Sequence, residues 1–236
     1  MHRVVFARPL VPGSKVELTR EQSHYLVNVL RMKEGEQFIG LDQEGKAFVL
    51  CLDTFGKGTV LFPGPEADNE PDFAVSLYVP LLKGDKLDWV VQKSVELGVS
   101  SIRLYSAQRA VVKEGNLEKK IARWEKIALE ATEQCRRQKV PPVRGIYTLE
   151  EVAAAGPGLF AWEEEANRGL QGWLQAHPKQ NLLLLTGPEG GLAAQEATLL
   201  KDAGWSAVSL GPRILRAETA AIAMLTCVMF AWGAMG

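Results

Sequence analysis

The chain has 236 residues, 47% of them hydrophobic, which is enough apolar material for one large or two small packed domains. Its formal net charge of −1 gives the chain as a whole no signature of a nucleic-acid binder. The three cysteines and three histidines form no CxxC or Cys/His spacing, which argues against a metal or disulfide framework and favours a reducing, cytoplasmic setting.

Residues 1–70 have the pattern of a small β-barrel that contains one helix. The expected strands, separated by Gly, Asp and Pro, cover Val4–Phe6, Gln37–Leu41, Ala47–Leu52 and Gly58–Phe62. Thr19 followed three residues later by Gln22 resembles a capping box, so we expect a helix to continue from there through His24 to Arg31. The N-terminus lacks the apolar core of a signal peptide.

The segment Pro63–Pro71 has the composition of a linker, and the pattern changes after it. In residues 71–236 apolar runs alternate with helical patterns, which predicts a parallel sheet with helices on its faces. The expected strands cover Phe73–Val79, Val99–Tyr105, Gly158–Trp162, Leu182–Leu185 and Ser206–Leu210. The expected helices begin after the N-caps Asp85 and Asn116 or cover 167–176, 193–203 and 217–232. The last helix is too short to span a bilayer and is expected to be buried.

Two glycine-containing loops carry the strongest chemical signal. They are LTGPEGG (185–191) and LGPRILRAETA (210–220), and each lies between an expected strand and an expected helix. Side by side, they would form a pocket made largely of backbone N–H and C=O groups, which suits a purine ring and an amino-acid tail. The string GPEGG matches neither the dinucleotide-binding nor the Walker pattern, and Glu189 disfavours a phosphate. We therefore expect an uncharged or cationic ligand such as S-adenosylmethionine, which carries a sulfonium.

Further motifs occur in a fixed order around these loops. They are His24 with Leu30-Arg31, Gln92-Lys93 with Glu96-Leu97-Gly98-Val99, Arg109 to Lys113, Trp124, and Glu130-Ala131 with Glu133 to Arg137. With both loops in register, the chain resembles the ribosomal RNA small-subunit methyltransferase E family, the 16S rRNA uracil-N3 methyltransferases of the SPOUT superfamily. Ala110 and Cys135 stand where the family pattern has Ser. Both side chains are small, so packing should be kept while any hydrogen bond from those hydroxyls is lost.

The resemblance implies an α/β fold with two domains. Residues 1–70 would form a PUA-like β-barrel that binds RNA, and residues 71–236 a SPOUT α/β-knot methyltransferase domain in which the C-terminal segment threads a loop to make a trefoil knot. The resemblance also implies a homodimer with S-adenosyl-L-methionine near the dimer interface, and 16S ribosomal RNA or the small ribosomal subunit as substrate; the Cys and His spacing predicts no metal.

The candidate cofactor-binding residues come from the two loops and from the end of one neighbouring strand. They are Glu163, Thr186, Gly187, Gly191, Leu210, Gly211, Ile214, Leu215 and Thr219. Ile214 and Leu215 stand between Arg213 and Arg216, and they either sandwich an aromatic ring or fill the core.

Catalysis at uracil N3 requires the loss of a weakly acidic proton, and a cation near O2 or O4 would stabilise the resulting anion. Arg137 and Arg216 are the candidates for that cation. For each, the alternative is a phosphate contact or a surface salt bridge. Glu189 either accepts the proton or only holds the N–H groups of its loop.

A basic segment supplies the candidate RNA contacts. Residues 83–144 hold 14 Lys and Arg against 8 Asp and Glu, which favours either a patch for a polyanion or a solvated helix face. The candidate RNA-binding residues, which include one from the first domain, are Arg31, Lys83, Lys86, Lys93, Arg109 and Lys113.

Three other functions compete with this interpretation. The chain could be a ribosome assembly factor that binds RNA without catalysis, although its cofactor loops are intact. It could be a related knotted methyltransferase that acts on transfer RNA. A nucleotide-dependent enzyme of another class would need a phosphate or metal motif, and the sequence has neither.

Overall fold

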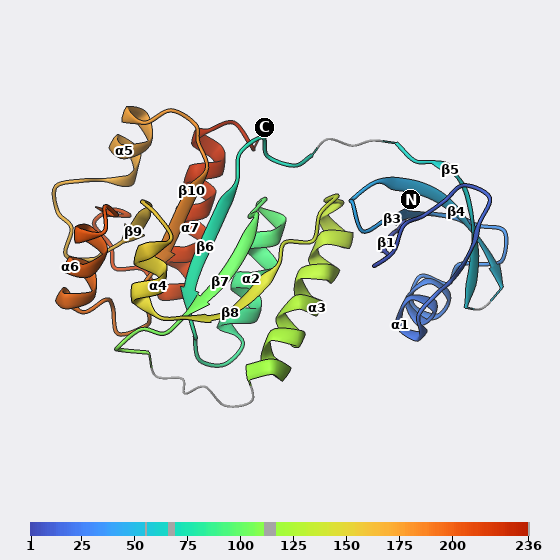
Figure 1. Ribbon diagram of the computed structural model, residues 1–236, viewed down its shortest axis with the longest axis horizontal. Coiled ribbons are helices and arrows are strands. Elements are labelled where there is room, and N and C mark those ends of the chain that lie inside the picture. Colours follow the sequence, from blue (N-terminus) through green and yellow to red (C-terminus); the bar gives the residue numbers. More distant parts are fainter. Residues whose placement is uncertain (55, 66–68, 111–116, 236) are drawn as a thin grey trace. The chain divides into compact units, whose positions relative to one another are not determined.

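The computed structural model describes residues 1–54, 56–65, 69–110 and 117–235 and divides into two compact units (Figure 1). Unit 1 consists of Met1–Glu70 together with Thr132–Val140, and unit 2 consists of Pro71–Ala131 together with Pro141–Gly236. Residues 132–140, which the sequence pattern assigned to the second domain, therefore pack with the first unit. Asn116 and Lys113 lie outside the described residues.

Unit 1 is built on a curled five-stranded sheet in the order β1-β3-β4-β5-β2. The strands are β1 (Arg3–Val5), β2 (Lys15–Glu17), β3 (Gln37–Leu41), β4 (Ala47–Thr54) and β5 (Lys57–Pro63). Only the β1–β3 pair is parallel. Alternate residues of β4 enter two different apolar clusters, Leu50 on one face and Val49 on the other, so this strand is buried on both faces.

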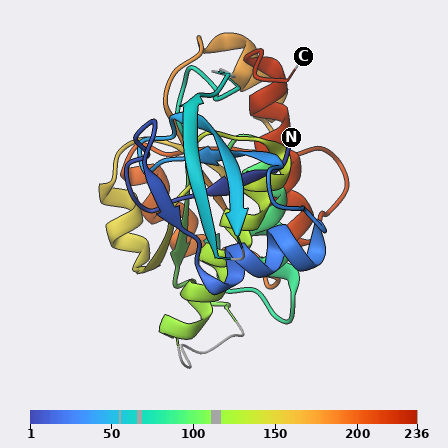
Figure 2. The same ribbon diagram turned by 90° about the vertical axis from the view of Figure 1, so that its right-hand side faces the viewer.

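The helical segment of unit 1 starts where the sequence predicts and ends earlier. Helix α1 (Arg20–Ser23) begins at Thr19 with both hydrogen bonds of the capping box, and it continues as the π-helical segment η1 (His24–Val29). The expected extension to Arg31 is wrong, because Arg31 takes a left-handed φ of 57°, the conformation that commonly ends a helix. This segment, the medium-blue helix in Figure 2, packs Leu26 into the same cluster as Leu50.

Unit 2 confirms the predicted parallel sheet with helices on its faces. Its six strands lie in the order β11-β9-β10-β6-β7-β8, and all pairs are parallel. The strands are β6 (Val75–Pro80), β7 (Ser101–Tyr105), β8 (Val143–Tyr147), β9 (Leu159–Ala161), β10 (Leu182–Thr186) and β11 (Ser206–Val208). Strand β8 and the short helix α4 (Leu149–Ala154) were not predicted; β8 is mostly half-exposed and contains Gly145, so it lacks the continuous apolar run of a buried parallel strand.

The helices of unit 2 cover both faces of this sheet. They are α2 (Lys86–Glu96), α3 (Leu117–Cys135, which ends within unit 1), α4, α5 (Leu170–Ala176), α6 (Ala194–Asp202) and α7 (Ala217–Ala231). Helix α7 packs beside α2 and along β10 and β6, while α4 and α6 join a core cluster on the other face (Figure 1). Asp85 precedes α2 but makes no capping hydrogen bond with its side chain, which instead lies 3.4 Å from Arg123. Among the described residues, none of the helices has the length and hydropathy needed to cross a membrane.

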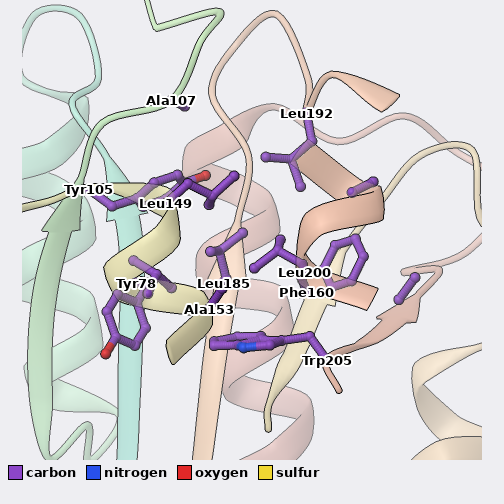
Figure 3. Close-up of a cluster of buried hydrophobic side chains, with 13 residues drawn as sticks. Tyr78, Tyr105, Ala107, Leu149, Ala153, Phe160, Leu185, Leu192, Leu200 and Trp205 are labelled. Atoms are coloured by element: carbon purple, nitrogen blue, oxygen red, sulfur yellow. The ribbon is translucent and has the colours of Figure 1, made fainter. Parts of the chain in front are cut away.

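The core cluster on the α4–α6 face lies directly beneath the first glycine-containing loop. Leu185 near the end of β10 and Leu192 just after the loop are both buried in it, together with Tyr105 and Phe160 (Figure 3). Both ends of the loop are therefore anchored in one packed core, so its backbone is held in place from below.

Candidate functional site

The two predicted loops line a single cavity of about 520 Å³ in unit 2. It opens beyond the carboxyl ends of β9, β10 and β11, the edge at which parallel α/β sheets commonly bind ligands. The lining residues are Lys86, Ala161, Trp162, Glu163, Gly187, Pro188, Glu189, Gly190, Gly191, Ser209, Leu210, Gly211, Pro212, Arg213, Ile214, Leu215, Arg216, Ala217 and Ala220.

The two loops are brought together by the spatial order of the strands in the sheet, which differs from their order in the sequence. Strand β9 lies between β10 and β11, so the loops after β10 and β11 meet across the end of β9. The segment after β11 is fixed further by Ser209, whose N–H donates to the carbonyl of Arg168 at 2.8 Å and whose carbonyl accepts from Leu170 at 3.0 Å. The second loop is thereby tied to the connection that leads from β9 to α5.

The first loop requires glycine at the cavity wall. Gly191 has a left-handed φ of 70°, and a Cβ placed there would lie 1.9 Å from Oε1 of Glu163. At the neighbouring Gly190, a Cβ would lie 3.2 Å from the Cβ of Arg109, whose Nη1 donates to the Gly190 carbonyl at 3.2 Å. Glu163 and Arg109 therefore rest against bare backbone of the loop.

A buried hydroxyl supports the same loop from the core side. The Tyr105 hydroxyl donates to the Thr186 carbonyl at 2.9 Å, and complete burial, with a smaller effect of the Glu196 carboxylate, raises the pKa of Tyr105 well above its usual value. Thr186 is itself buried and does not line the cavity. The buried Glu196 accepts hydrogen bonds from the N–H groups of Gln108 and Ala193, both at 2.8 Å.

The second loop exposes its apolar residues. Ile214 is 89% exposed, so the alternative in which it fills the core is wrong, and Leu215 is half-buried. Arg213 and Arg216 are also exposed at the cavity. Thr219 lies in the first turn of α7, is exposed, and is absent from the cavity lining.

The cavity also has an ionic edge. Lys86 Nζ lies 3.2 Å from Oε1 of Glu189 and 3.5 Å from Oε2 of Glu218. Burial would raise the pKa of Glu189, but hydrogen bonds from the backbone N–H groups of Lys83 and of Glu189 itself, together with Lys86, lower it below its ordinary value. A carboxylate with a lowered pKa is a weaker proton acceptor, which favours the loop-holding alternative for Glu189.

Arg137 does not belong to the unit that holds the cavity. It is a buried residue of unit 1, and its Nη2 lies 2.6 Å from Oε2 of Glu70, while its Nε donates to both carboxylate oxygens at 3.2 Å. Glu70 also accepts from the N–H groups of Gln138 and Lys139. Burial would raise the pKa of Glu70, but Arg137 and these N–H groups lower it. Through these bonds Glu70 and Arg137 fasten residues 132–140 to the rest of unit 1.

Three of the candidate RNA contacts, Lys83, Lys86 and Arg109, lie beside the first loop, where each makes a hydrogen bond to Glu189 or Gly190. Arg31 is exposed in unit 1, and Lys83 and Arg109 are exposed in unit 2. Lys93 pairs with Glu96 of its own helix at 2.8 Å, and Lys86 pairs with the two carboxylates of the ionic edge.

Sequence reasoning missed several cavity residues that flank the motifs. Trp162 and Ser209 lie at the ends of expected strands, and Pro212 lies inside the second loop sequence. The sequence therefore contained enough information to predict all three as cavity residues. Lys86 had no local signal, because its place at the cavity depends on how α2 packs. Nowhere in the described ranges do His, Cys, Asp and Glu side chains gather in a group that could hold a metal ion.

Comparison with known proteins gives consistent matches over both units. Residues 69–229 match the family described as RNA methyltransferase domain, and residues 18–60 match the RNA methyltransferase PUA domain. The chain is 35% identical over 227 residues to the ribosomal RNA small subunit methyltransferase E of Bacillus subtilis, covering 90% of this chain and 89% of that protein.

Two solved structures extend this similarity to three dimensions. A methyltransferase from Legionella pneumophila, in complex with the cofactor SAM, is 29% identical with a TM-score of 0.90 and covers 97% of each chain. The ribosomal RNA small subunit methyltransferase E of Neisseria gonorrhoeae, bound to S-adenosyl methionine, is 32% identical with a TM-score of 0.89 and covers 98% of each chain.

Proposed function

The chain belongs to the ribosomal RNA small subunit methyltransferase E family, and from this premise we propose that it transfers the methyl group of S-adenosyl-L-methionine to N3 of a uridine in 16S ribosomal RNA. The observation that carries the proposal is the single cavity that the loops 187–191 and 210–216 line together. Two similar proteins were solved with this same cofactor.

The residues of the cavity fit such a cofactor. Four glycines contribute to the wall, and at one of them, Gly191, a Cβ would occupy the space that the Glu163 carboxylate uses. Among the lining residues, Trp162 has a buried Nε1 atom without a hydrogen-bond partner within the described ranges. We assign cofactor binding to Glu163, Gly187, Gly191, Leu210, Gly211, Ile214 and Leu215, with Thr186 and Thr219 as neighbours of this wall.

The bound sulfonium would supply an electrophilic methyl group for in-line transfer. The task of the protein is then to align uracil N3 with that methyl group and to stabilise the negative charge that develops on the base. Arg216, exposed at the cavity mouth, is the cation we assign to the developing charge on O2 or O4. Arg137 is engaged by Glu70, so we assign it an anchoring role, and Glu189 holds its loop through Lys83 and Lys86.

RNA binding is assigned to both units. The PUA match lies in residues 1–70, which we propose as an RNA-binding domain, followed by the methyltransferase domain in residues 71–236. Within the second of these domains, residues 132–140 pack with unit 1. Arg31, Lys83 and Arg109 are exposed cations suited to phosphate contacts. We also place the protein in the cytoplasm, in keeping with its three free cysteines and its ribosomal substrate.

A second copy of the chain is the proposed partner for the apolar surface of α7. On this helix Phe230 is 71% exposed and Cys227 is exposed, while Trp89 of the adjacent α2 is 44% exposed. Ile214, in the loop that leads into α7, is 89% exposed. A homodimer would cover them.

The trefoil knot is part of the same proposal. Strand β11 lies at the edge of the sheet. After it the chain passes the connection between β9 and β10, to which Ser209 is hydrogen-bonded. Helix α7 then packs along β10 and β6, in the middle of the sheet. Stretching the chain from its two ends should then leave a tightened knot and a contour length shorter than that of a fully extended chain.

The function is tested by incubating the purified protein with labelled S-adenosylmethionine and small ribosomal subunits from a strain that lacks the enzyme. We expect label in 16S RNA, and digestion with mass spectrometry should identify 3-methyluridine. Binding of subunits without methyl transfer would instead support a non-catalytic assembly factor, and label in transfer RNA alone would support the transfer-RNA alternative.

A further inference from the structure

Lys86, the first residue of α2, stands between the two loops that line the cavity. Its Nζ donates to Oε1 of Glu189 in the first loop at 3.2 Å. It also lies 3.5 Å from Oε2 of Glu218, near the end of the second loop sequence and in the first turn of α7. The exposed fractions of the three side chains are 33%, 22% and 15%, so solvent screens these charges only in part.

The two carboxylates depend on this ammonium to different degrees. Glu189 Oε1 also accepts the backbone N–H of Lys83 at 3.2 Å. Glu218 Oε2 is buried and accepts no hydrogen bond from the described part of the chain, which makes the nearby ammonium of Lys86 its main compensation there. Because both carboxylates lie within 3.5 Å of this one ammonium, loss of Lys86 would remove the charge that offsets their mutual repulsion, and the loops would be held together less firmly.

We propose that Lys86 is a positioning residue that holds both cofactor loops in the geometry required for binding the methyl donor. This proposal rests on the proposed function and deepens it, because it assigns a side chain of α2 to the shape of the cavity. It also replaces the expectation that Lys86 contacts RNA, since its ammonium is already neutralised by Glu189 and Glu218.

Two other roles of Lys86 predict different behaviour. An RNA-phosphate contact would change RNA affinity and its salt dependence but not cofactor affinity. If Lys86 acted on the ligand only through its charge, removing it would strengthen binding of the donor, whose sulfur is a cation. Binding of the product, whose thioether sulfur carries no charge, would not change. A bridge between the loops shapes the site for both ligands alike.

The test compares Lys86→Met with Lys86→Arg, using the full chain. Calorimetry should show that Lys86→Met weakens S-adenosylmethionine and S-adenosylhomocysteine equally, by about tenfold, as expected for loss of a preorganised site. Lys86→Arg should restore most of the affinity. Lys179→Met is the matched control, since Lys179 belongs to the same unit, pairs with Asp72 and lies outside the cavity lining, and it should leave both affinities unchanged.

Double variants identify the partners. If Lys86 acts through both carboxylates, adding Glu218→Gln or Glu189→Gln to Lys86→Met should cost less than the sum of the single changes. Strictly additive losses in both pairs would refute the bridge. A change in affinity for the charged donor alone would also refute it. So would a reduced salt dependence of RNA binding with both ligand affinities unchanged.

Hydrogen exchange without ligand separates this inference from the proposed function. In Lys86→Met the amides of 187–191 and 210–217 should exchange faster than in the wild type, while those of the β7 strand should not. Unchanged loop exchange would refute the bridge even in a protein that binds the donor. Faster loop exchange in a protein that binds no donor would retain the bridge and refute the cofactor assignment.

Discussion

Replacing Gly191 with alanine separates two contributions to the cavity. The left-handed φ of 70° disfavours any residue with a Cβ, at a cost of roughly 1–2 kcal/mol. The new methyl would also lie 1.9 Å from Oε1 of Glu163. Because Glu163 is exposed and flexible, its displacement should add little to the loss of stability.

The expected results therefore differ between stability and binding. The melting temperature should fall by about 2–8 °C, which is the backbone cost converted for a chain of this size. Affinity for S-adenosylmethionine should fall by tenfold or more, because the displaced Glu163 side chain moves into space at the cavity wall. The larger substitution Gly191→Arg should abolish binding by filling the cavity.

Differential scanning calorimetry and titration calorimetry measure the two effects. Gly204→Ala is the control, because Gly204 has a φ of 88°, lies outside the cavity lining, and has its nearest atom 4.0 Å from an added Cβ. It should lose similar stability and keep its cofactor affinity. Wild-type affinity in Gly191→Ala, or equal losses of affinity in both variants, would refute the reasoning about Glu163.

Three further predictions concern charge and assembly. Arg137→Ala should lower the free energy of unfolding by about 3 kcal/mol in urea, because it leaves the Glu70 carboxylate without its guanidinium counterion. Since the fold lowers the pKa of Glu70, wild-type stability from this pair should be complete above about pH 4.3 and be lost as the pH falls through the lowered pKa. Arg216→Ala should reduce methyl transfer in a radiolabel assay with unchanged cofactor affinity, and equal losses would move Arg216 out of the substrate site. Phe230→Asp should convert a dimer into a monomer by light scattering, and an unchanged mass would contradict the proposed interface.

The strands of unit 2 were predictable where burial on both faces produces continuous apolar runs. The run Leu182–Leu185 lies in the middle of the parallel sheet and corresponds to β10. Strand β8 lies at the edge and is mostly half-exposed, so its composition did not distinguish it from a loop. Helix α4 does have a sequence signal, the capping box formed by Thr148 and Glu151.

The candidate site was less predictable because its residues meet through tertiary packing. The glycine-containing strings identified both loops, but the approach of Glu163 to Gly191 depends on the pairing of β9 with β10. The pairing of Arg137 with Glu70 joins residues that are 67 positions apart and depends on the packing of 132–140 in unit 1. Charge counts made Arg137 and Lys86 look like free cations, because a count contains no information about partners.

A cavity built from backbone needs rigidity that its own glycines cannot provide. In this protein the rigidity comes from the packed core under the first loop and from a buried hydrogen bond at the end of β10. Leu185 and Leu192 anchor the ends of the first loop in the core, and the Tyr105 hydroxyl fixes the Thr186 carbonyl where the strand ends. The polar groups that face the ligand can then remain few, since the loop is shaped before the ligand arrives and binding does not have to order it. Because the backbone itself shapes the cavity, its tightest steric constraint falls on a residue without a side chain, Gly191.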